Sequence, residues 1–423
     1  MASIRKSLLQ FLMSGVYMKR WNDKLRPTEF YEVDKQAHKM IVAFALAELY
    51  AQNRNLNISE RQELHATIVK NGIYEYLFRL VITDIKPSIL NNIRNKESEF
   101  SALAQWGLDE TERYVRPLGD ALWNDYVQYV KRPKLVAKND SIEQVAETIL
   151  YASHVFSSLW EYKLIEKLNV YDDETNSVLK ELRNTLKEYA ILDEIKLLED
   201  RHSALYKFVA FCGQLRFQKR WSQVPRVPET SVLGHMFIVA VYAYCFSVVE
   251  EACSARCINN FYGGLFHDLP ELLTRDIISP VKKATENLAN IIQQYEKSEM
   301  DKRVFEPLKN AGLTNILERL KYYLGYEVGS EFKECIILDN KVKKIDFNEL
   351  STFYNENKYD PKDGSLIKTC DTLAAFIEAY LAVRNGMSSE QLHEALWRMR
   401  TEQMKKTTYL KHIHLASLYA DFD

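Results

Sequence analysis

The sequence predicts an all-α protein made of two tandem helical units. Three observations favour this fold class: residues that break helices are scarce, apolar residues recur with helical spacing, and segments of the first half recur in order in the second. The 423 residues include 13 Gly and 10 Pro, both well below average usage, and both residues disfavour helix interiors. The alternation of apolar and polar residues that is typical of strands is scarce.

Three segments carry the clearest helix signals. Residues 235–252 (HMFIVAVYAYCFSVVEEA) are apolar on nearly every side, as expected of a buried helix. Residues 388–404 open with serines suited to an N-cap and continue with apolar residues at helical spacing. We expect a third helix from a cap at Ser59 to an end at Gly72. Residues 225–232 (PRVPETSV) are the clearest extended loop, because two prolines exclude a helix there.

An internal repeat predicts the domain organisation. Four matches occur in the same order, which predicts a first unit at 1–200 and a second at 201–423. The seam near residue 200 lacks Pro and Gly, so we expect the units to pack against each other rather than to be joined by a flexible linker. The matched pairs are 19–27 with 219–227, 38–44 with 235–241, 72–89 with 264–281, and 152–161 with 369–378.

Composition excludes several classes of function. The formal net charge of -2 provides no basic field for nucleic acid, so no nucleic-acid partner is expected. Charged residues interrupt the apolar patch at the N-terminus, and we expect no uninterrupted apolar run of about 18 residues, so neither a signal peptide nor a membrane span is predicted. Six cysteines without a CxxC pair suit a reduced compartment. The expectation is a soluble, cytoplasmic protein.

Four residues of the second unit predict a metal site. His235 opens the buried helix, His267 and Asp268 end an apolar run, and Asp371 lies inside another apolar helix. A buried carboxylate is costly unless something pairs with it, and one divalent cation would satisfy all four side chains. Two imidazoles and two carboxylates suit Mn, Fe, Co, Ni or Zn, and leave positions for water and a phosphate oxygen. This set predicts hydrolysis of phosphate esters.

The ordered set resembles that of the HD-domain metal-dependent phosphohydrolases, and the wider pattern is similar to the bacterial 5'-deoxynucleotidase group. The resemblance covers most of residues 203–385. The residues that carry it, beyond the four above, are Arg220-Trp221, Glu271 in the run His-Asp-x-x-Glu, the later Asp276-x-x-x-Pro-Val-Lys282, and Thr372-Leu373 after the last Asp.

The resemblance implies a role for each matched position. His235, His267, Asp268 and Asp371 would ligate the metal, with Asp268 also counted among the catalytic residues. Glu271 would act as general acid or base, and Arg220 would bind and orient the substrate phosphate. Trp221 would pack near the sugar or base, and Asp276 through Ser279 would contact the sugar. One departure is Gly234, where relatives often carry Glu just before the first ligand; this puts the identity of the substrate in doubt.

The function that follows is a metal-dependent nucleotidase that removes phosphate from (deoxy)nucleoside 5'-monophosphates, with a small-molecule nucleotide as its partner. Two alternatives stay open. One is another HD phosphohydrolase activity, on nucleoside triphosphates, cyclic nucleotides or guanosine alarmones. The other is a nucleotide-sensing regulator without turnover. The identity of the metal and a possible homodimer stay open as well.

The first unit is expected to be a degenerate HD-like copy that does not catalyse, because the His-Asp pair and the acid/base Glu are replaced. Two other hypotheses are a cation site formed by His38, Glu75 and His154, and a regulatory nucleotide site at Arg20 and Trp21. The matched positions are His38 for His235, Glu75-Tyr76 for His267-Asp268, Arg79 for Glu271, Asp84 for Asp276, His154 for Asp371, and Arg20-Trp21 for Arg220-Trp221.

Overall fold

The computed structural model describes residues 2–132, 141–274, 285–405 and 410–422. Helices hold 71% of the structure and strands 4%, which confirms the predicted all-α fold class. Two short antiparallel hairpins supply the strands, β1 with β2 and β3 with β4. Their bounds are Lys19–Arg20, Phe30–Tyr31, Cys335–Leu338 and Lys341–Lys344.

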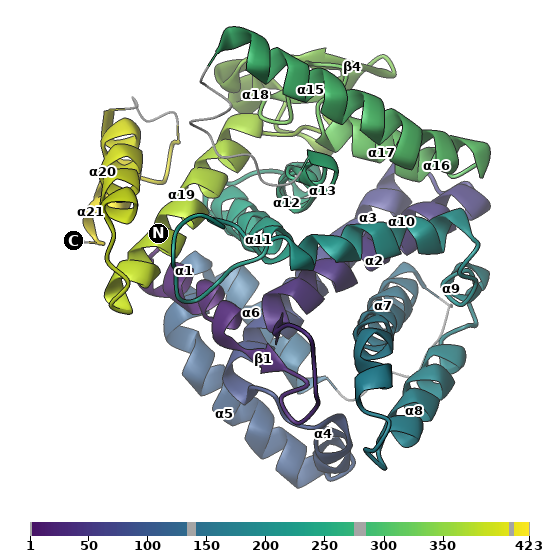
Figure 1. Ribbon diagram of the computed structural model, residues 1–423. Coiled ribbons are helices and arrows are strands. Elements are labelled where there is room, and N and C mark those ends of the chain that lie inside the picture. Colours follow the sequence, from purple (N-terminus) through teal and green to yellow (C-terminus); the bar gives the residue numbers. More distant parts are fainter. Residues whose placement is uncertain (1, 133–140, 275–284, 406–409, 423) are drawn as a thin grey trace.

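The helices follow one another along the chain with short connections (Figure 1). Those of the first half are α1 (Lys6–Met13), α2 (Glu32–Arg54), α3 (Ile58–Ile82), α4 (Pro87–Arg94), α5 (Glu97–Val115), α6 (Asp120–Lys131), α7 (Ile142–Ile165), α8 (Thr175–Glu188) and α9 (Asp193–Lys196). Those of the second half are α10 (Ala204–Gly213), α11 (Val232–Val249), α12 (Ser254–Phe266), α13 (Glu271–Thr274), α15 (Glu286–Met300), α16 (Glu306–Asn310), α17 (Thr314–Tyr323), α18 (Phe347–Phe353), α19 (Gly364–Arg384), α20 (Glu390–Lys405) and α21 (Leu415–Ala420).

Two long helices, α2 and α11, form the centre of the molecule and pack against each other. Figure 1 shows α3, α7, α12 and α19 around them. One continuous hydrophobic core contains residues from both halves of the chain, including Phe44 of α2 and Phe266 of α12, whose rings lie 5.0 Å apart. The halves therefore pack tightly together, as the seam without Pro or Gly predicts. The boundary near residue 200 stays a prediction.

Helix α11 is buried nearly all round, as its apolar sequence predicts. It is also long and apolar enough to cross a membrane by length and composition, and it is the one such helix among the described residues. The expectation that no such run exists is therefore wrong, but 89% of this helix lies buried inside the protein. Here it serves as a core helix.

Helix α3 corrects one predicted boundary. It starts after Asn57, whose side chain accepts a hydrogen bond from the backbone of Glu60, so Ser59 is not the cap. It also continues through Gly72 to Ile82. Gly72 does not end the helix; a Cβ at this position would lie 2.5 Å from the sulfur of Met40 on α2. The glycine therefore lies inside the helix, where α3 packs against the side chain of Met40, rather than at a helix end.

Candidate metal centre

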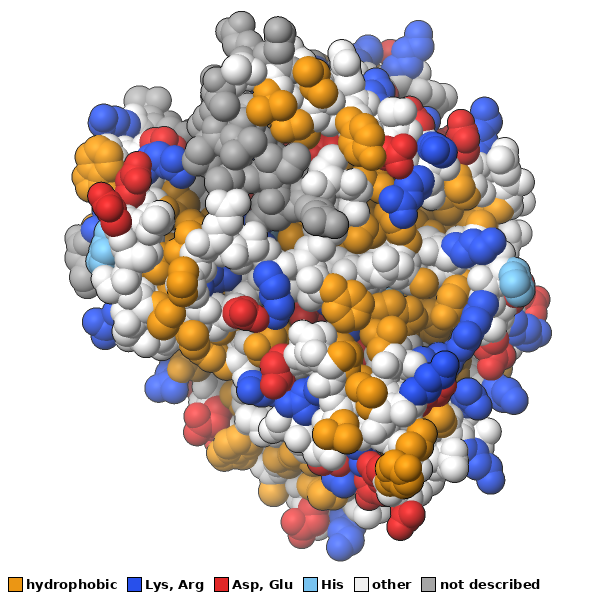
Figure 2. Space-filling model, in the orientation of Figure 1, with side chains coloured by type: hydrophobic (Ala, Val, Ile, Leu, Met, Phe, Trp, Pro, Cys, Tyr) orange, Lys and Arg blue, Asp and Glu red, His pale blue; other side chains and the backbone are white. Residues whose placement is uncertain are grey.

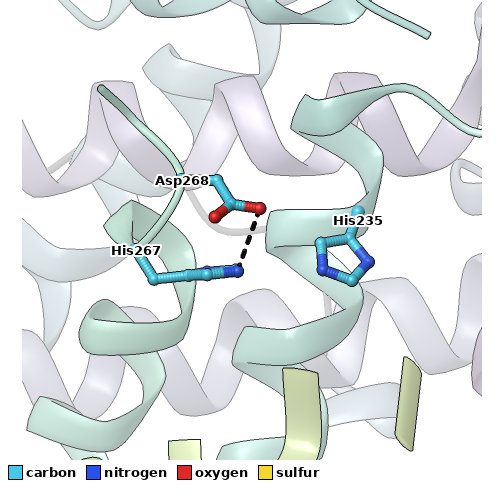
Figure 3. A group of neighbouring side chains, drawn as sticks. All are labelled: His235, His267 and Asp268. Carbon is cyan, nitrogen blue, oxygen red and sulfur yellow. Dashed lines mark ion pairs between the residues drawn. The ribbon is translucent and has the colours of Figure 1, made fainter. Parts of the chain in front are cut away.

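The four predicted ligands converge at the contact between three helices. His235 lies one turn into α11, His267 and Asp268 directly follow α12, and Asp371 lies on α19. The ligand atoms of His235, His267 and Asp268 lie within 4.8 Å of one another (Figure 3). Asp371 joins them, because its Oδ1 lies 3.0 Å from Nε2 of His235 and 3.8 Å from Nε2 of His267.

A glycine permits this convergence. A Cβ on Gly264 would lie 2.8 Å from the backbone nitrogen of Ala240 on α11, so any larger residue would push α12 away. The close approach carries the end of α12, and with it His267, towards the N-terminal part of α11. His267 Nε2 then lies 3.2 Å from Oδ2 of Asp268.

Both imidazoles present Nε2 to the centre of the cluster. His267 donates from Nδ1 to the carbonyl oxygen of Gly264 at 2.8 Å, and His235 donates from Nδ1 to Glu378 at 3.2 Å. Within the described part of the chain, Nε2 of His267 is buried and accepts no hydrogen bond. A metal-bound histidine in proteins characteristically has its second ring nitrogen held by a carbonyl or carboxylate. These residues therefore fit a divalent cation.

The charges around the cluster also favour a bound cation. Four carboxylates surround it against three cations, Arg220, Arg226 and Lys368, so negative charge is in excess among the described residues. Burial opposes charge on His267, yet the neighbouring carboxylates raise the pKa of His267 well above its ordinary value. The site thus strongly favours added positive charge. The four carboxylates are Asp268, Glu271, Asp371 and Glu378.

Glu378 is a site residue that the sequence analysis missed. Its buried carboxylate accepts hydrogen bonds from Trp221 Nε1 at 2.9 Å and Arg220 Nε at 3.4 Å, in addition to the bond from His235. Burial alone would raise the pKa of Glu378, but Arg220 and His235 hold it far below its ordinary value. A signal existed in the sequence, because Glu378 is a charge inside the same apolar helix as Asp371.

Arg220 and Trp221 lie where the sequence analysis expects them, beside the cluster. Arg220 donates from one terminal nitrogen to Asp268 Oδ2 at 3.3 Å. Trp221 is half-buried and adopts the left-handed backbone region, with φ of 58°. A second residue that the sequence analysis missed is Lys368, whose Nζ lies 2.7 Å from Asp371 Oδ2 at the exposed rim.

Glu271 begins α13 and is buried, one turn after Asp268. Its backbone nitrogen donates to the carbonyl oxygen of Asp268 at 3.0 Å, so the two residues belong to one tight turn. The expected role of Glu271 as general acid or base stays a prediction. Asp276 and Ser279, the expected sugar contacts, lie outside the described residues.

The packing around residue 234 explains why a glycine occupies this position. A Cβ at this position would lie 2.8 Å from Oδ1 of Asp34 on α2. Asp34 accepts a short hydrogen bond from Ser231, the residue that caps α11. The first half thus places a carboxylate beside position 234, and a larger side chain there would require Asp34 and Val33 to shift.

The first half contains the same Trp–Glu hydrogen bond and the same strand pairing as the second half. Trp21 Nε1 donates to Glu161 at 2.9 Å, as Trp221 does to Glu378. Trp21 also adopts the left-handed region, with φ of 54°. The antiparallel pairing of Lys19 with Tyr31 has its counterpart in the bridge between residues 219 and 231.

This correspondence changes which residue of the first half is aligned with the metal ligand His235. Tyr31 and Ser231 both immediately precede their helices, so Lys35 rather than His38 corresponds to His235. Lys35 Nζ lies 2.5 Å from Nδ1 of His154. His38 instead donates to the carbonyl oxygen of Val209 at 3.0 Å, away from that cluster. The hypothesis of a cation site that includes His38 is therefore wrong.

Comparison with known proteins gives one match. Residues 212–400 match the family model of the HD domain. The match supports an HD domain in the second half of the chain. It spans all four converging residues, and HD domains are typically metal-dependent phosphohydrolases that bind divalent metals. Neither the search of curated proteins nor that of solved structures gives a match.

Proposed function

We propose that the second half hydrolyses (deoxy)nucleoside 5'-monophosphates to nucleoside and phosphate. One observation carries the proposal: two imidazoles and two carboxylates from three helices converge in a site with an excess of negative charge. His235, His267, Asp268 and Asp371 would hold a divalent cation there. The cation would supply a water of lowered pKa and offset phosphate charge.

Arg220 would orient the phosphate. Its Nε and one terminal nitrogen are held by Glu378 and Asp268, which fixes the plane of the guanidinium. The other terminal nitrogen donates no hydrogen bond to any described residue, so it is free for a phosphate oxygen. Charge-assisted bonds of this kind are strong and directional. Lys368, at the rim beside Asp371, would add a second positive charge to the phosphate pocket.

Glu271 would transfer a proton during the reaction. Its place one turn after Asp268 keeps it near the reacting groups, where a buried carboxyl is suited to the role of general acid or base. Trp221 would contact the sugar or base, and Asp276 with Ser279 would contact the sugar. A preference for deoxyribose rests on these last contacts.

The first half is proposed to be a non-catalytic copy of the same unit, so that the chain is a tandem duplication. The matched Trp–Glu pairs support this proposal. A nucleotide site in the first half gains no support, because Arg20 uses all its nitrogens within the protein. They donate to Glu161, Glu32 and Ser158.

A phosphate-release screen tests the proposal. Protein loaded with Mn, Co, Fe, Ni or Zn is incubated with nucleoside monophosphates, triphosphates, cyclic nucleotides and guanosine alarmones, with Asp268→Ala as the control. We expect metal-dependent release from monophosphates that Asp268→Ala abolishes. Release from another class only would assign the site to that alternative. Nucleotide binding without release, unchanged by Glu271→Ala, would indicate a regulator.

A further inference from the structure

A surface cavity is lined by residues between 159 and 201 and shares no residue with the metal centre. It has a volume of about 230 Å³ and opens between α7, α8 and the segment that follows α9. Three buried leucines of these elements line it: Leu159, Leu186 and Leu198. These leucines belong to the core and form a small apolar floor under a cavity that is otherwise lined by polar side chains.

Three cationic side chains converge on the same cavity. Lys163 lies one turn after Leu159 on α7, Arg183 lies one turn before Leu186 on α8, and Arg201 follows Leu198. Glu199 is the one acidic residue among the lining residues, so the lining carries two positive charges in excess. Figure 2 shows Lys and Arg side chains gathered on the side of the molecule where Figure 1 places α7, α8 and α9.

These cations are unpaired within the described part of the chain. Lys163, Arg183 and Arg201 form no hydrogen bond or ion pair with any residue that the structure describes. Burial and the charges of Arg201 and Arg183 lower the pKa of the half-buried Lys163, against the opposing effect of Glu166 and Glu199. Like charges held together around one cavity repel one another, and an anion between them would relieve that repulsion.

The size and charge of the cavity restrict the ligand. A volume of about 230 Å³ is below the roughly 300–1,000 Å³ typical of sites for drug-sized ligands, so the ligand is small. A phosphomonoester carries a charge of about -1.5 to -2 with three acceptor oxygens. That charge balances the excess of the lining, and two arginines with a lysine suit three oxygens. The leucines suit a small apolar group on the ester.

We propose that this cavity binds a small phosphomonoester with an apolar substituent, at a site separate from the metal centre. Calorimetric titration of the full chain tests the proposal. The protein is treated with chelator, so that the metal centre neither hydrolyses nor ligates the probe. The probes are phenyl phosphate, inorganic phosphate and benzoate. They separate the contribution of the phosphate from those of the ring and of a single carboxylate.

Phenyl phosphate should bind most tightly, and inorganic phosphate and benzoate more weakly. Arg201→Gln and Arg183→Gln should each weaken phenyl phosphate binding about tenfold or more, because each removes a charge-assisted hydrogen bond. Both side chains are exposed, so these variants fold. Lys163→Met should act in the same direction. Lys341→Gln removes an exposed cation on β4, far from the cavity lining, and should leave the affinity unchanged.

Three results would overturn the proposal. The first is an absence of phenyl phosphate binding to the parent protein. The second is equal affinity in the parent, Arg183→Gln and Arg201→Gln, which would place the probe elsewhere, such as beside Arg220. The third is benzoate binding as tightly as phenyl phosphate, which would show that the cavity does not select a phosphate. None of these results depends on the proposed nucleotidase activity.

Discussion

Glu378→Gln is the sharpest test of how the metal centre is held. The substitution keeps the size of the side chain and removes the charge that accepts the Nδ1 hydrogen of His235 at 3.2 Å. Loss of such a carboxylate behind a metal-bound histidine typically lowers metal affinity about 10- to 100-fold, or roughly 1.4 to 2.7 kcal/mol. Glu378 is thus a positioning residue, since it acts through His235 and Arg220.

The assay is competitive titration of the divalent ion against a chromophoric chelator, with thermal unfolding of the metal-free protein measured in parallel. A matched control exists in the first half. Glu161→Gln removes an equally buried carboxylate that accepts from Trp21 at 2.9 Å, but no histidine of a metal cluster depends on it. Both variants should lower the melting temperature, and only Glu378→Gln should weaken metal binding.

Two results would refute the reasoning. If Glu378→Gln bound the ion as tightly as the parent, the tautomer and orientation of His235 would not depend on the carboxylate. If Glu161→Gln weakened metal binding by the same factor, the effect would come from general loosening of the shared core. Saturating metal should restore part of the turnover of Glu378→Gln, because Asp268 still holds Arg220.

Three further outcomes are expected. Asp268→Ala should lose bound metal and phosphate release together, as measured by elemental analysis and a phosphate assay; turnover at the parental rate would contradict the site. Burial lowers the pKa of Lys35 from 10.5 to about 7 in the folded protein, so deprotonation of Lys35 should make stability rise above pH 7, up to the pKa of the unfolded chain. Lys35→Met should flatten that rise in urea unfolding and leave turnover intact. Burial raises the pKa of Asp34 to about 6, against the effect of Arg216. Ionisation of Asp34 therefore costs stability as pH rises from about 4 to 6, and Asp34→Asn should be the more stable protein at pH 7.5 by about 1 to 3 kcal/mol. An unchanged melting temperature would contradict this.

The sequence was sufficient for the fold class and for the four converging side chains. The helical spacing of apolar residues and the scarcity of Gly and Pro are local properties of the sequence. They can therefore be recognised without knowledge of tertiary contacts. The ligands could be found because a charge in an apolar helix, such as Asp371 in α19, requires a partner. The same reasoning applies to Glu378, whose partners Arg220, Trp221 and His235 lie more than 140 residues earlier in the chain and cannot be paired with it from local sequence.

The error at His38 has a different origin. The sequence alignment paired two histidines, His38 and His235, because each opens an apolar run. The packing of α2 and α11 shows a different register between the two halves of the chain. The glycine that faces α2 is Gly72, which meets Met40, and the glycine that faces α11 is Gly264, which meets Ala240. Met40 therefore corresponds to Ala240. A helix–helix contact of this kind cannot be read from either segment alone.

The corrected register explains how the first half can do without a metal. Lys35 brings a side-chain amine to His154 at 2.5 Å, and Lys39 brings another to Glu75 at 3.1 Å. Burial holds the pKa of His154 down to about 4, so its imidazole is neutral. At the four matched positions the first half has one carboxylate, Glu75, which is already paired with Lys39, whereas the second half has two carboxylates and two imidazoles. The second set therefore attracts a divalent ion more strongly than the first, so the same helical framework favours a metal in the second half.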